Sequence, residues 1–167
     1  KFDVLEGGVR VPMIIRWPGR VMAGTVYDEM VSSMDVYPTL VHAAGLQMPK
    51  GQTTDGVDLI PFINGEGTSK PHDWLCWQNR SWLPKTEGGY GVPTLKVHNS
   101  AIRKGNWKLV RFNEKIGSDD RSPDWKLYDL SSDIGEQKDV AHQHLDIVKS
   151  LSGLFDDWRS SMHPTVE

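Results

Sequence analysis

An almost continuously apolar run from Val9 to Trp17 constrains the fold more than any other feature of the sequence. The run is rich in β-branched residues and ends at Pro18-Gly19, a pair that typically marks a turn. Strands with apolar residues on both faces are typical of parallel sheets whose two sides are covered. We therefore predict a buried strand over residues 9–17, and such a strand needs neighbours that the following residues do not supply.

A helix is expected next, beginning at Asp35 and ending at Gly45. Asp35 is a favourable N-cap residue, and Pro38 falls within the first turn, where its missing N–H does no harm. Apolar residues recur at helical spacing through this segment: Tyr37, Leu40, Val41 and Ala44. From Gly45 to Pro71, repeated glycine and proline residues leave room for one short helical turn, over residues 57–63.

After residue 71 the pattern changes from helical to extended. Short segments rich in aromatic and β-branched residues predict strands over residues 74–77, 101–103, 107–112 and 125–130. The turn Lys104-Gly105-Asn106 joins two of them as a hairpin. An apolar stripe near the end predicts an amphipathic helix over one face of the sheet: Val148, Leu151, Phe155, Trp158 and Met162. Residues 1–70 are thus the end of something larger plus a linker, and residues 71–167 a small α+β domain.

Charge and cysteine content exclude several classes of function. The 167 residues carry 19 Lys and Arg against 22 Asp and Glu, which gives a net charge of −3 without long runs of like charge. Such a chain has no basic tract that would recruit nucleic acid or an anionic membrane. Its longest apolar runs are far shorter than the roughly 18 residues of a membrane span. The single cysteine, Cys76, offers neither an internal disulfide nor the spacing of a zinc site.

The first residues resemble a signature of the sulfatase family. Lys1 is followed after a short spacer by Glu6-Gly7-Gly8, an aliphatic residue and Arg10. Further segments resemble the C-terminal half of the family in the expected order: residues 17–19, 31–40, 55–59, 101–109 and 127–130, with Asp133 and Glu136. The ordered segments cover nearly the whole chain. The chain is therefore similar to the C-terminal portion of a sulfatase of the alkaline-phosphatase-like superfamily.

The resemblance implies a fold class and a reaction. The fold class is α/β, of the alkaline-phosphatase-like type, with residues 1–70 as the last strand and helix of the large domain plus a linker. Residues 71–167 would form its small α+β domain, about four antiparallel strands covered by a C-terminal helix. Enzymes of the family hydrolyse sulfate esters with a formylglycine made from Cys or Ser in a Cys/Ser-x-Pro/Ala-x-Arg motif, beside a calcium ion.

The same resemblance places the nucleophile and the calcium site upstream of Lys1. Cys76 lacks the Pro or Ala and the Arg at the required offsets, so this chain is expected to hold neither metal nor cofactor and to be inactive alone. Its implied partners are the missing N-terminal part of the same protein and a sulfated carbohydrate or aryl sulfate substrate. The family also suggests a periplasmic, secreted or lysosomal location.

Lys1 matches the lysine that contacts the sulfate in the family. A cation suits that place because negative charge builds on the sulfuryl and leaving oxygens as the S–O bond breaks. Glu6 and Arg10 could act as an acid–base pair, but a structural ion pair that fixes the glycine turn is the favoured interpretation. Gly7 and Gly8 are expected to supply backbone conformations with φ > 0.

The segment from Trp77 to His98 is expected to be a long loop that reads the substrate. It combines aromatic side chains, cations and glycines, so it could hold a sulfated saccharide beyond the scissile group. The candidate substrate-binding residues are Trp77, Asn79, Arg80, Trp82 and His98. The alternative is a surface insertion that does not contact substrate. His142 and His144, without a third clear ligand nearby, are not expected to bind a metal.

Two other functions fit the same sequence. Phosphonate or phosphate monoester hydrolases of the superfamily share much of this C-terminal pattern, and an upstream nucleophile motif other than Cys/Ser-x-Pro-x-Arg would indicate them. A noncatalytic carbohydrate-binding module would use the aromatic segment to stack on sugars. Binding without turnover in the intact protein would favour such a module.

Overall fold

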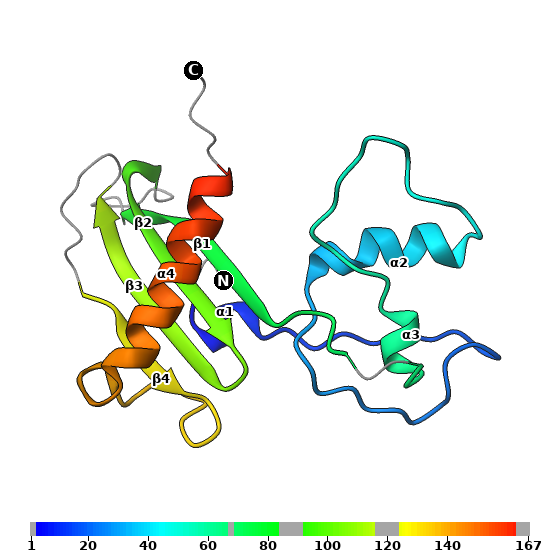
Figure 1. The fold of residues 1–167 in the computed structure, drawn as a ribbon, viewed down its shortest axis with the longest axis horizontal. Helices are drawn as coiled ribbons and strands as arrows, with labels where there is room; N and C mark the ends of the chain where they lie inside the picture. The colour runs from blue at the N-terminus through cyan, green and yellow to red at the C-terminus, as the bar shows by residue number, and fades with distance from the viewer. Residues whose placement is uncertain (1–2, 67–68, 84–91, 116–123, 163–167) are drawn as a thin grey trace. The chain divides into compact units, whose positions relative to one another are not determined.

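Figure 1 shows a computed structural model of the chain, which describes residues 3–66, 69–83, 92–115 and 124–162. Residues 80–83, 92–97 and 113–115 are described by their backbone alone. The chain forms two compact units, Lys1–Val11 with Trp74–Glu167, and Pro12–Asp73. We call the first the sheet unit and the second the helical unit.

The sheet unit is built on a four-stranded antiparallel sheet with the strand order β1-β2-β3-β4. Its strands are β1 (Trp74–Leu83), β2 (Val92–Lys104), β3 (Trp107–Lys115) and β4 (Lys126–Asp129). Each strand pairs with its neighbours in sequence, so β1 and β4 form the two edges. The predicted sheet of about four antiparallel strands is confirmed.

The hairpin between β2 and β3 turns at Gly105 and Asn106. Lys104 pairs with Trp107 across this turn, and Gly105 has a φ of 58°. A positive φ at the first central position is what a type II′ hairpin turn requires, and glycine adopts it without steric cost. The predicted turn is confirmed, and the glycine is the reason for it.

Helix α4 (Leu145–Met162) lies across one face of the sheet (Figure 1). Its buried residues Leu151 and Phe155 pack against inward side chains of β2, β3 and β4: Ile102, Leu109 and Leu127. Trp125 meets the Phe155 ring edge-on, with ring centroids 5.3 Å apart, and the Trp158 ring lies 5.4 Å from the same centroid. The predicted amphipathic helix over one face of the sheet is confirmed, and Trp125 and Trp158 both pack against its core.

The opposite face of the sheet is covered by the N-terminal segment. Val4 is buried there in a second apolar cluster, with Ala101, Val110, Tyr128 and Leu130. The single helical turn α1 (Glu6–Val9) follows it, where the sequence predicted a glycine turn. Contacts of Val4 and Glu6 with distant parts of the chain fix this helical turn, and no local pattern reveals such contacts.

The helical unit contains the 3₁₀ turn η1 (Ser33–Asp35), α2 (Val36–Ala43) and α3 (Ile60–Ile63). Both α-helices lie where the sequence predicts them. Ser32 is the N-cap of the 3₁₀ turn, and its side chain forms a capping box with that of Asp35. Asp35 is the N-cap residue of α2, as predicted, but its side chain makes no capping hydrogen bond to that helix and instead accepts from the Ser32 N–H of the preceding 3₁₀ turn.

Asp35 is fully buried and joins three parts of the helical unit. Its carboxylate accepts the Ser32 N–H at 2.6 Å and the Val57 N–H at 2.9 Å. The His72 Nε2 atom lies 2.8 Å and 3.0 Å from the two carboxylate oxygens. The helical unit is thus organised around a buried carboxylate.

The predicted buried strand over residues 9–17 is wrong. Val9 ends α1, residues 10–17 are not in a strand, and the Val11 and Ile14 side chains are 75% and 93% exposed. A buried strand is stable only when neighbouring strands pair with its backbone. The helical unit offers no such strand among its described residues.

The longest helix that the structure describes, α4, has exposed polar side chains along its outer face, among them Lys149, Asp157 and Ser160. Within the described parts of the chain, no helix is both long and apolar enough to cross a membrane.

Replacing Asp35 with alanine is expected to loosen the helical unit locally. The Ser32 and Val57 amides would lose a charged acceptor, a hydrogen bond of about 1.5–3 kcal/mol. Their hydrogen exchange should therefore accelerate by roughly 10- to 100-fold. Asp55→Ala, at an exposed carboxylate of the same unit, is the control and should change neither rate. Equal effects of the two variants would contradict the structural role of Asp35.

Candidate functional site

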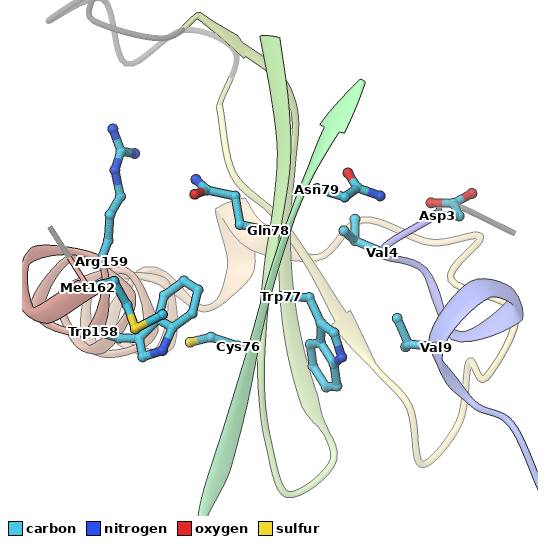
Figure 2. A pocket seen from close by; sticks show the side chains of 10 residues that line it. All are labelled: Asp3, Val4, Val9, Cys76, Trp77, Gln78, Asn79, Trp158, Arg159 and Met162. Atoms are coloured by element: carbon cyan, nitrogen blue, oxygen red, sulfur yellow. The ribbon is translucent and has the colours of Figure 1, made fainter. Parts of the chain in front are cut away.

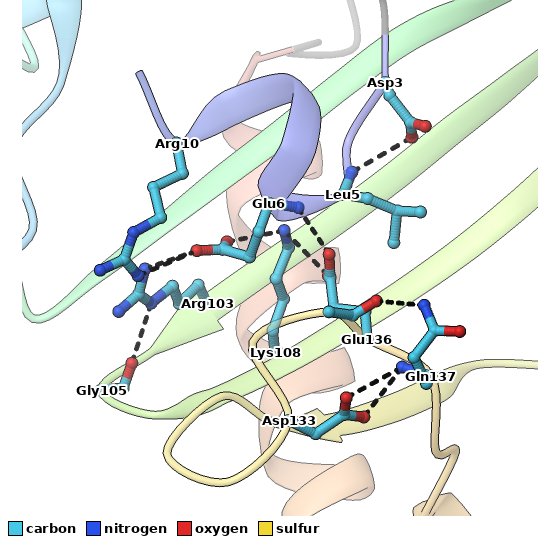
Figure 3. A network of polar contacts seen from close by, with 11 residues as sticks. Asp3, Leu5, Glu6, Arg10, Arg103, Gly105, Lys108, Asp133, Glu136 and Gln137 are labelled. Atoms are coloured by element: carbon cyan, nitrogen blue, oxygen red, sulfur yellow. Dashed lines mark hydrogen bonds and ion pairs between the residues drawn. The ribbon is translucent and has the colours of Figure 1, made fainter. Parts of the chain in front are cut away.

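A lysine ammonium lies buried between two glutamates in the sheet unit (Figure 3). Lys108 Nζ is 2.8 Å from Glu6 Oε1 and 3.0 Å from Glu136 Oε1. The Lys108 side chain is 0% exposed, and the two glutamate side chains are 4% and 2% exposed. The Glu6 backbone N–H also donates to Glu136 Oε2 at 2.5 Å. We call Glu6, Lys108 and Glu136 the buried charge cluster.

Two arginines extend the buried charge cluster toward solvent. Arg103 Nη1 lies 3.1 Å and Arg10 Nη1 3.5 Å from Glu6 Oε2, the oxygen that Lys108 leaves open. Arg103 also donates from Nε to the Gly105 carbonyl at 3.0 Å, which fixes its guanidinium. The predicted Glu6–Arg10 ion pair is thus present, but it is the longest of the contacts that Glu6 makes. Because Glu6 has three cationic neighbours, its carboxylate serves as a structural anchor rather than as a free acid or base.

Glu136 reaches Glu6 from an unusual backbone conformation. Its φ is 52°, in the left-handed region that residues other than glycine rarely adopt. The loop around it is held by Asp133, whose carboxylate accepts the Gln137 N–H at 2.9 Å and the Lys138 N–H at 2.8 Å. The surrounding hydrogen bonds therefore determine where the Glu136 carboxylate lies (Figure 3).

The expected positive φ at Gly7 and Gly8 is wrong. Both residues lie in α1, and neither is among the glycines with positive φ. The structure shows a steric requirement instead, because a Cβ atom on Gly8 would overlap the backbone carbonyl of Asp3. A Cβ on Gly7 would meet nothing within 4 Å. Gly8 is needed for the close approach of α1 to the preceding residues, whereas Gly7 is not.

Sequence reasoning did not single out Lys108, Arg103 or Glu136 as partners of Glu6. One signal was available in β3, where Lys108 alternates with Val110 and Phe112 and so lies on the face that packs against Val4. A lysine at an inward position needs a carboxylate partner. The sequence could not say which one, because the partners lie 102 residues before it and in a loop after β4.

A cavity of about 460 Å³ lies along the edge strand β1 (Figure 2). On one side of the strand, Trp77 and Asn79 face the N-terminal segment, with Asp3, Val4 and Val9. On the other side, the cavity is lined by Cys76 and Gln78 together with three residues of α4: Trp158, Arg159 and Met162. The alternation of side chains along β1 divides the cavity between the two faces of the sheet.

The structure separates the predicted substrate-binding residues. Trp77 is half-buried against the second apolar cluster, and Lys108 Nζ lies 5.8 Å from its ring centroid. Arg80 pairs with His98 in the β1–β2 register, where Asn79 pairs with Asn99. By alternation, His98 is on the α4 face and Trp77 and Asn79 are on the opposite face.

The expectation of a long loop from Trp77 to His98 is wrong. Strand β1 continues to Leu83 and β2 begins at Val92, so most of the segment is a hairpin with an irregularity between Arg80 and Trp82. Trp82 pairs with Pro93 in this hairpin. The polar and aromatic composition suggested a loop, but paired strands can carry polar and aromatic side chains as well. Lys1 and the side chains of Arg80 and Trp82 lie outside the described residues.

Among the described residues, no cluster fits a metal ion, and Cys76 lacks the sequence context of a formylglycine precursor. The part of the chain that the structure describes has no group of three or more His, Cys, Asp or Glu that could hold a metal ion. His142 is exposed, and the His144 ring lies 4.9 Å from that of Trp107. Cys76 is half-buried in β1, and burial raises the pKa of its thiol to about 12. A raised pKa keeps the thiol neutral and lowers its nucleophilicity.

The family model for the C-terminal part of N-sulphoglucosamine sulphohydrolase matches residues 1–160 of this chain. The chain belongs to the sulfatase family. It aligns with the C-terminal part of longer sulfatases, so the expected family and the expected place within it are both confirmed.

Curated relatives show the same membership. The chain is 38% identical over 182 aligned positions to the uncharacterized sulfatase YdeN of Escherichia coli. This alignment covers 98% of the present chain and 31% of YdeN. The chain is 43% identical over 144 positions to human arylsulfatase D. This alignment covers 80% of the present chain and 24% of arylsulfatase D. The sulfatase chain described here thus spans about a quarter to a third of the length of these relatives.

Solved structures share the fold. A structure described as a complex with its substrate D-glucosamine-2-N,6-O-disulfate matches with a TM-score of 0.67 at 20% identity, over 92% of this chain and 28% of that one. The phosphonate monoester hydrolase of Silicibacter pomeroyi matches with a TM-score of 0.62 at 22% identity, over 87% of this chain and 28% of that one. Likenesses at these identities show the fold and do not assign the substrate.

Replacing Lys108 with methionine is expected to destabilise the sheet unit strongly. The change would leave two buried carboxylates without their shared cation, at a cost of about 3–5 kcal/mol. The thermal unfolding midpoint, followed by tryptophan fluorescence, should fall by roughly 10 °C. Lys104→Met, at an exposed lysine of the same hairpin, is the matched control and should change the midpoint little. A Lys108→Met midpoint close to that of Lys104→Met would show that the cluster contributes no stability.

The raised pKa of Cys76 predicts slow alkylation. A higher pKa favours the neutral thiol, and only the thiolate reacts, so at pH 8 the folded protein should react with iodoacetamide roughly 10³-fold more slowly than the unfolded chain. Peptide mapping by mass spectrometry measures the alkylation of Cys76 separately from that of any other cysteine in the intact protein. Similar rates with and without urea would mean that solvent reaches the thiol freely.

Proposed function

We propose that this chain is the C-terminal part of an enzyme that hydrolyses a sulfate ester of a sulfated carbohydrate. In this proposal residues 1–70 end the large α/β domain and lead into the linker, and residues 71–167 form the small domain. Membership of the sulfatase family supports the reaction. The fold shared with a protein solved in complex with a disulfated glucosamine supports the substrate class.

Lys1 is proposed to contact the sulfate. As the S–O bond breaks, negative charge grows on the sulfuryl oxygens and on the leaving oxygen, and a nearby ammonium stabilises it more than it stabilises the ground state. Lysine provides a compact charge with rotatable donors that can follow this change. Its interaction therefore appears in kcat rather than in the binding of substrate.

The observation that carries this proposal is the cavity wall to which Asp3 contributes. Asp3, which follows Lys1 after a single intervening residue, lines the same cavity as Trp77 and Asn79. An aromatic face and an amide are suited to a sugar, because the face packs on its C–H groups and the amide binds its hydroxyls. The sugar that carries the sulfate would lie against this wall. Arg80, Trp82 and His98 would act further along the hairpin.

The formylglycine nucleophile and the calcium ion belong to the upstream part of the enzyme in this proposal. When bound there, they would supply the attack on sulfur and the charge that holds the sulfate in place. The residues of the present chain contribute binding, orientation and the charge of Lys1. The chain by itself is therefore expected to have no sulfatase activity.

Lys1→Ala in the intact enzyme tests the proposal. With a chromogenic aryl sulfate, kcat should fall by roughly 10²-fold or more while KM changes little, as for the loss of an oxyanion donor. Lys126→Ala, at an exposed lysine of β4, should leave both constants unchanged. A raised KM with unchanged kcat would assign Lys1 to ground-state binding. Turnover by residues 1–167 alone would place the nucleophile within this chain.

A phosphonate or phosphate monoester hydrolase is the second candidate, favoured by the fold match to the phosphonate monoester hydrolase of Silicibacter pomeroyi. The ratio of kcat/KM for an aryl sulfate to that for an aryl phosphonate ester separates the two, together with the sequence upstream of Lys1. Saccharide binding without turnover of either ester would indicate a noncatalytic carbohydrate-binding module.

A further inference from the structure

We propose that the α4 side of the cavity is a subsite for a second, anionic sugar unit, so that the substrate is an oligosaccharide that crosses the edge strand β1. In this subsite Arg159 binds the anionic group, Trp158 packs on the sugar ring and Gln78 binds a hydroxyl. The inference deepens the proposed function and rests on it. That proposal uses only the opposite wall of the cavity, with Trp77 and Asn79.

Both walls belong to one cavity. Strand β1 runs between them, with Trp77 directed to one side and Gln78 to the other (Figure 2). The cavity volume of about 460 Å³ lies within the range of roughly 300–1,000 Å³ that is typical of small-molecule sites. A ligand that fills this cavity has to contact both walls, which a sugar held against Trp77 alone does not do.

The edge strand offers hydrogen-bonding groups to a ligand that crosses it. Among the described strands, β1 pairs with β2 alone, and an edge strand directs alternate N–H and C=O groups away from its one neighbour. Hydroxyl groups both donate and accept hydrogen bonds, so those of a sugar can pair with either kind of backbone group. A saccharide chain can therefore pass over β1 without leaving these groups unpaired.

The charges of the cavity direct an anionic group to the α4 wall. Arg159, in the last turn of α4, brings a guanidinium to this wall. The fork of a guanidinium matches paired oxygens such as those of a carboxylate or a phosphate, and sulfate presents the same arrangement. Asp3, on the opposite wall, repels an anion but accepts hydrogen bonds from hydroxyls. The two walls thus differ in the sugar unit that they favour.

Two half-buried side chains beside Arg159 are held in place before a ligand binds. The Trp158 ring packs against that of Phe155, with centroids 5.4 Å apart, and also lines the cavity. Gln78 Nε2 donates at 3.3 Å to Oγ of the fully buried Ser100, which orients its amide beside the cavity. Because both side chains are already ordered, binding costs little side-chain entropy.

The two walls repeat the same pair of groups. A tryptophan and a side-chain amide line each side of β1: Trp77 and Asn79 on one side, and Trp158 and Gln78 on the other. An aromatic face packs on the C–H groups of a sugar, and an amide binds its hydroxyls. An extended peptide could also pair with an edge strand, but the repeated pair favours two sugar units of one chain.

Arg159→Gln in the intact enzyme tests the inference. Because the guanidinium contact is made in the ground state and the transition state alike, KM for a sulfated tetrasaccharide should rise roughly 10-fold with kcat nearly unchanged. KM for a chromogenic aryl sulfate, which has no second sugar, should not change. Lys149→Gln removes the same charge from an exposed position of α4 and should alter neither substrate. The tetrasaccharides form a panel built on glucosamine and on galactose.

A second pair of variants adds a negative charge instead. Met162 lines the cavity and is 55% exposed, whereas Leu145, at the other end of α4, is 69% exposed and is not a lining residue. Met162→Glu should raise KM for the tetrasaccharide by roughly 10-fold through repulsion of the anionic group, and Leu145→Glu should leave it unchanged. A tetrasaccharide that lacks the anionic group on its second sugar should respond to neither Arg159→Gln nor Met162→Glu.

The aryl sulfate separates failure of the inference from failure of the proposed function. If it is hydrolysed but Arg159→Gln and Met162→Glu leave tetrasaccharide KM unchanged, or no tetrasaccharide is a substrate, the reaction stands and the inference is overturned. Pairing of a peptide with β1 would then be the remaining use of the cavity. An equal rise of KM for the aryl sulfate, or for the tetrasaccharide without the second anionic group, would also overturn the inference. If the intact enzyme hydrolyses neither kind of sulfate ester, the proposed function fails and the inference fails with it.

Discussion

The sheet unit depends on an ammonium group that has lost all contact with water. An isolated charge of this kind would be very costly in the interior, so the folded state of Lys108 requires both Glu6 and Glu136. These residues come from three separate segments: the N-terminal turn, β3 and the loop after β4. The buried charge cluster joins the three segments, which makes the N-terminal turn a part of the sheet unit.

The two faces of the sheet are built differently. The α4 face is an apolar core of aliphatic and aromatic side chains, whereas the opposite face combines an apolar cluster with the buried charges. Because side chains alternate along β1, neighbouring residues contribute to different walls of the cavity. Trp77 is associated with the N-terminal segment and Gln78 with α4 (Figure 2). A change in packing on either face of the sheet can therefore alter the cavity, because β1 contributes side chains to both of its walls.

Local patterns predicted the sheet, its central hairpin and α4, because alternation, a glycine turn and an apolar stripe each act over a few residues. They failed for residues 9–17, because an apolar run is buried as a strand only where neighbouring strands pair with it. They also failed for the hairpin beyond Asn79, where the amino-acid composition suggested a loop. Gly8 was singled out for the wrong reason, since its importance is steric. Lys108 and Glu136 were missed as site residues because pairing between distant charges leaves no periodic signal.

The separation of the cluster along the chain has a consequence for folding. Glu6 bonds to residues 102 and 130 positions away, so these contacts close very long loops. Because closing a long loop costs chain entropy, the contacts are expected to form late in folding. During synthesis, α1 leaves the ribosome before β3 and the loop after β4, so Lys108 and Glu136 become available to Glu6 only later. The N-terminal turn is thus expected to dock onto the sheet only after β3 and the loop after β4 have formed.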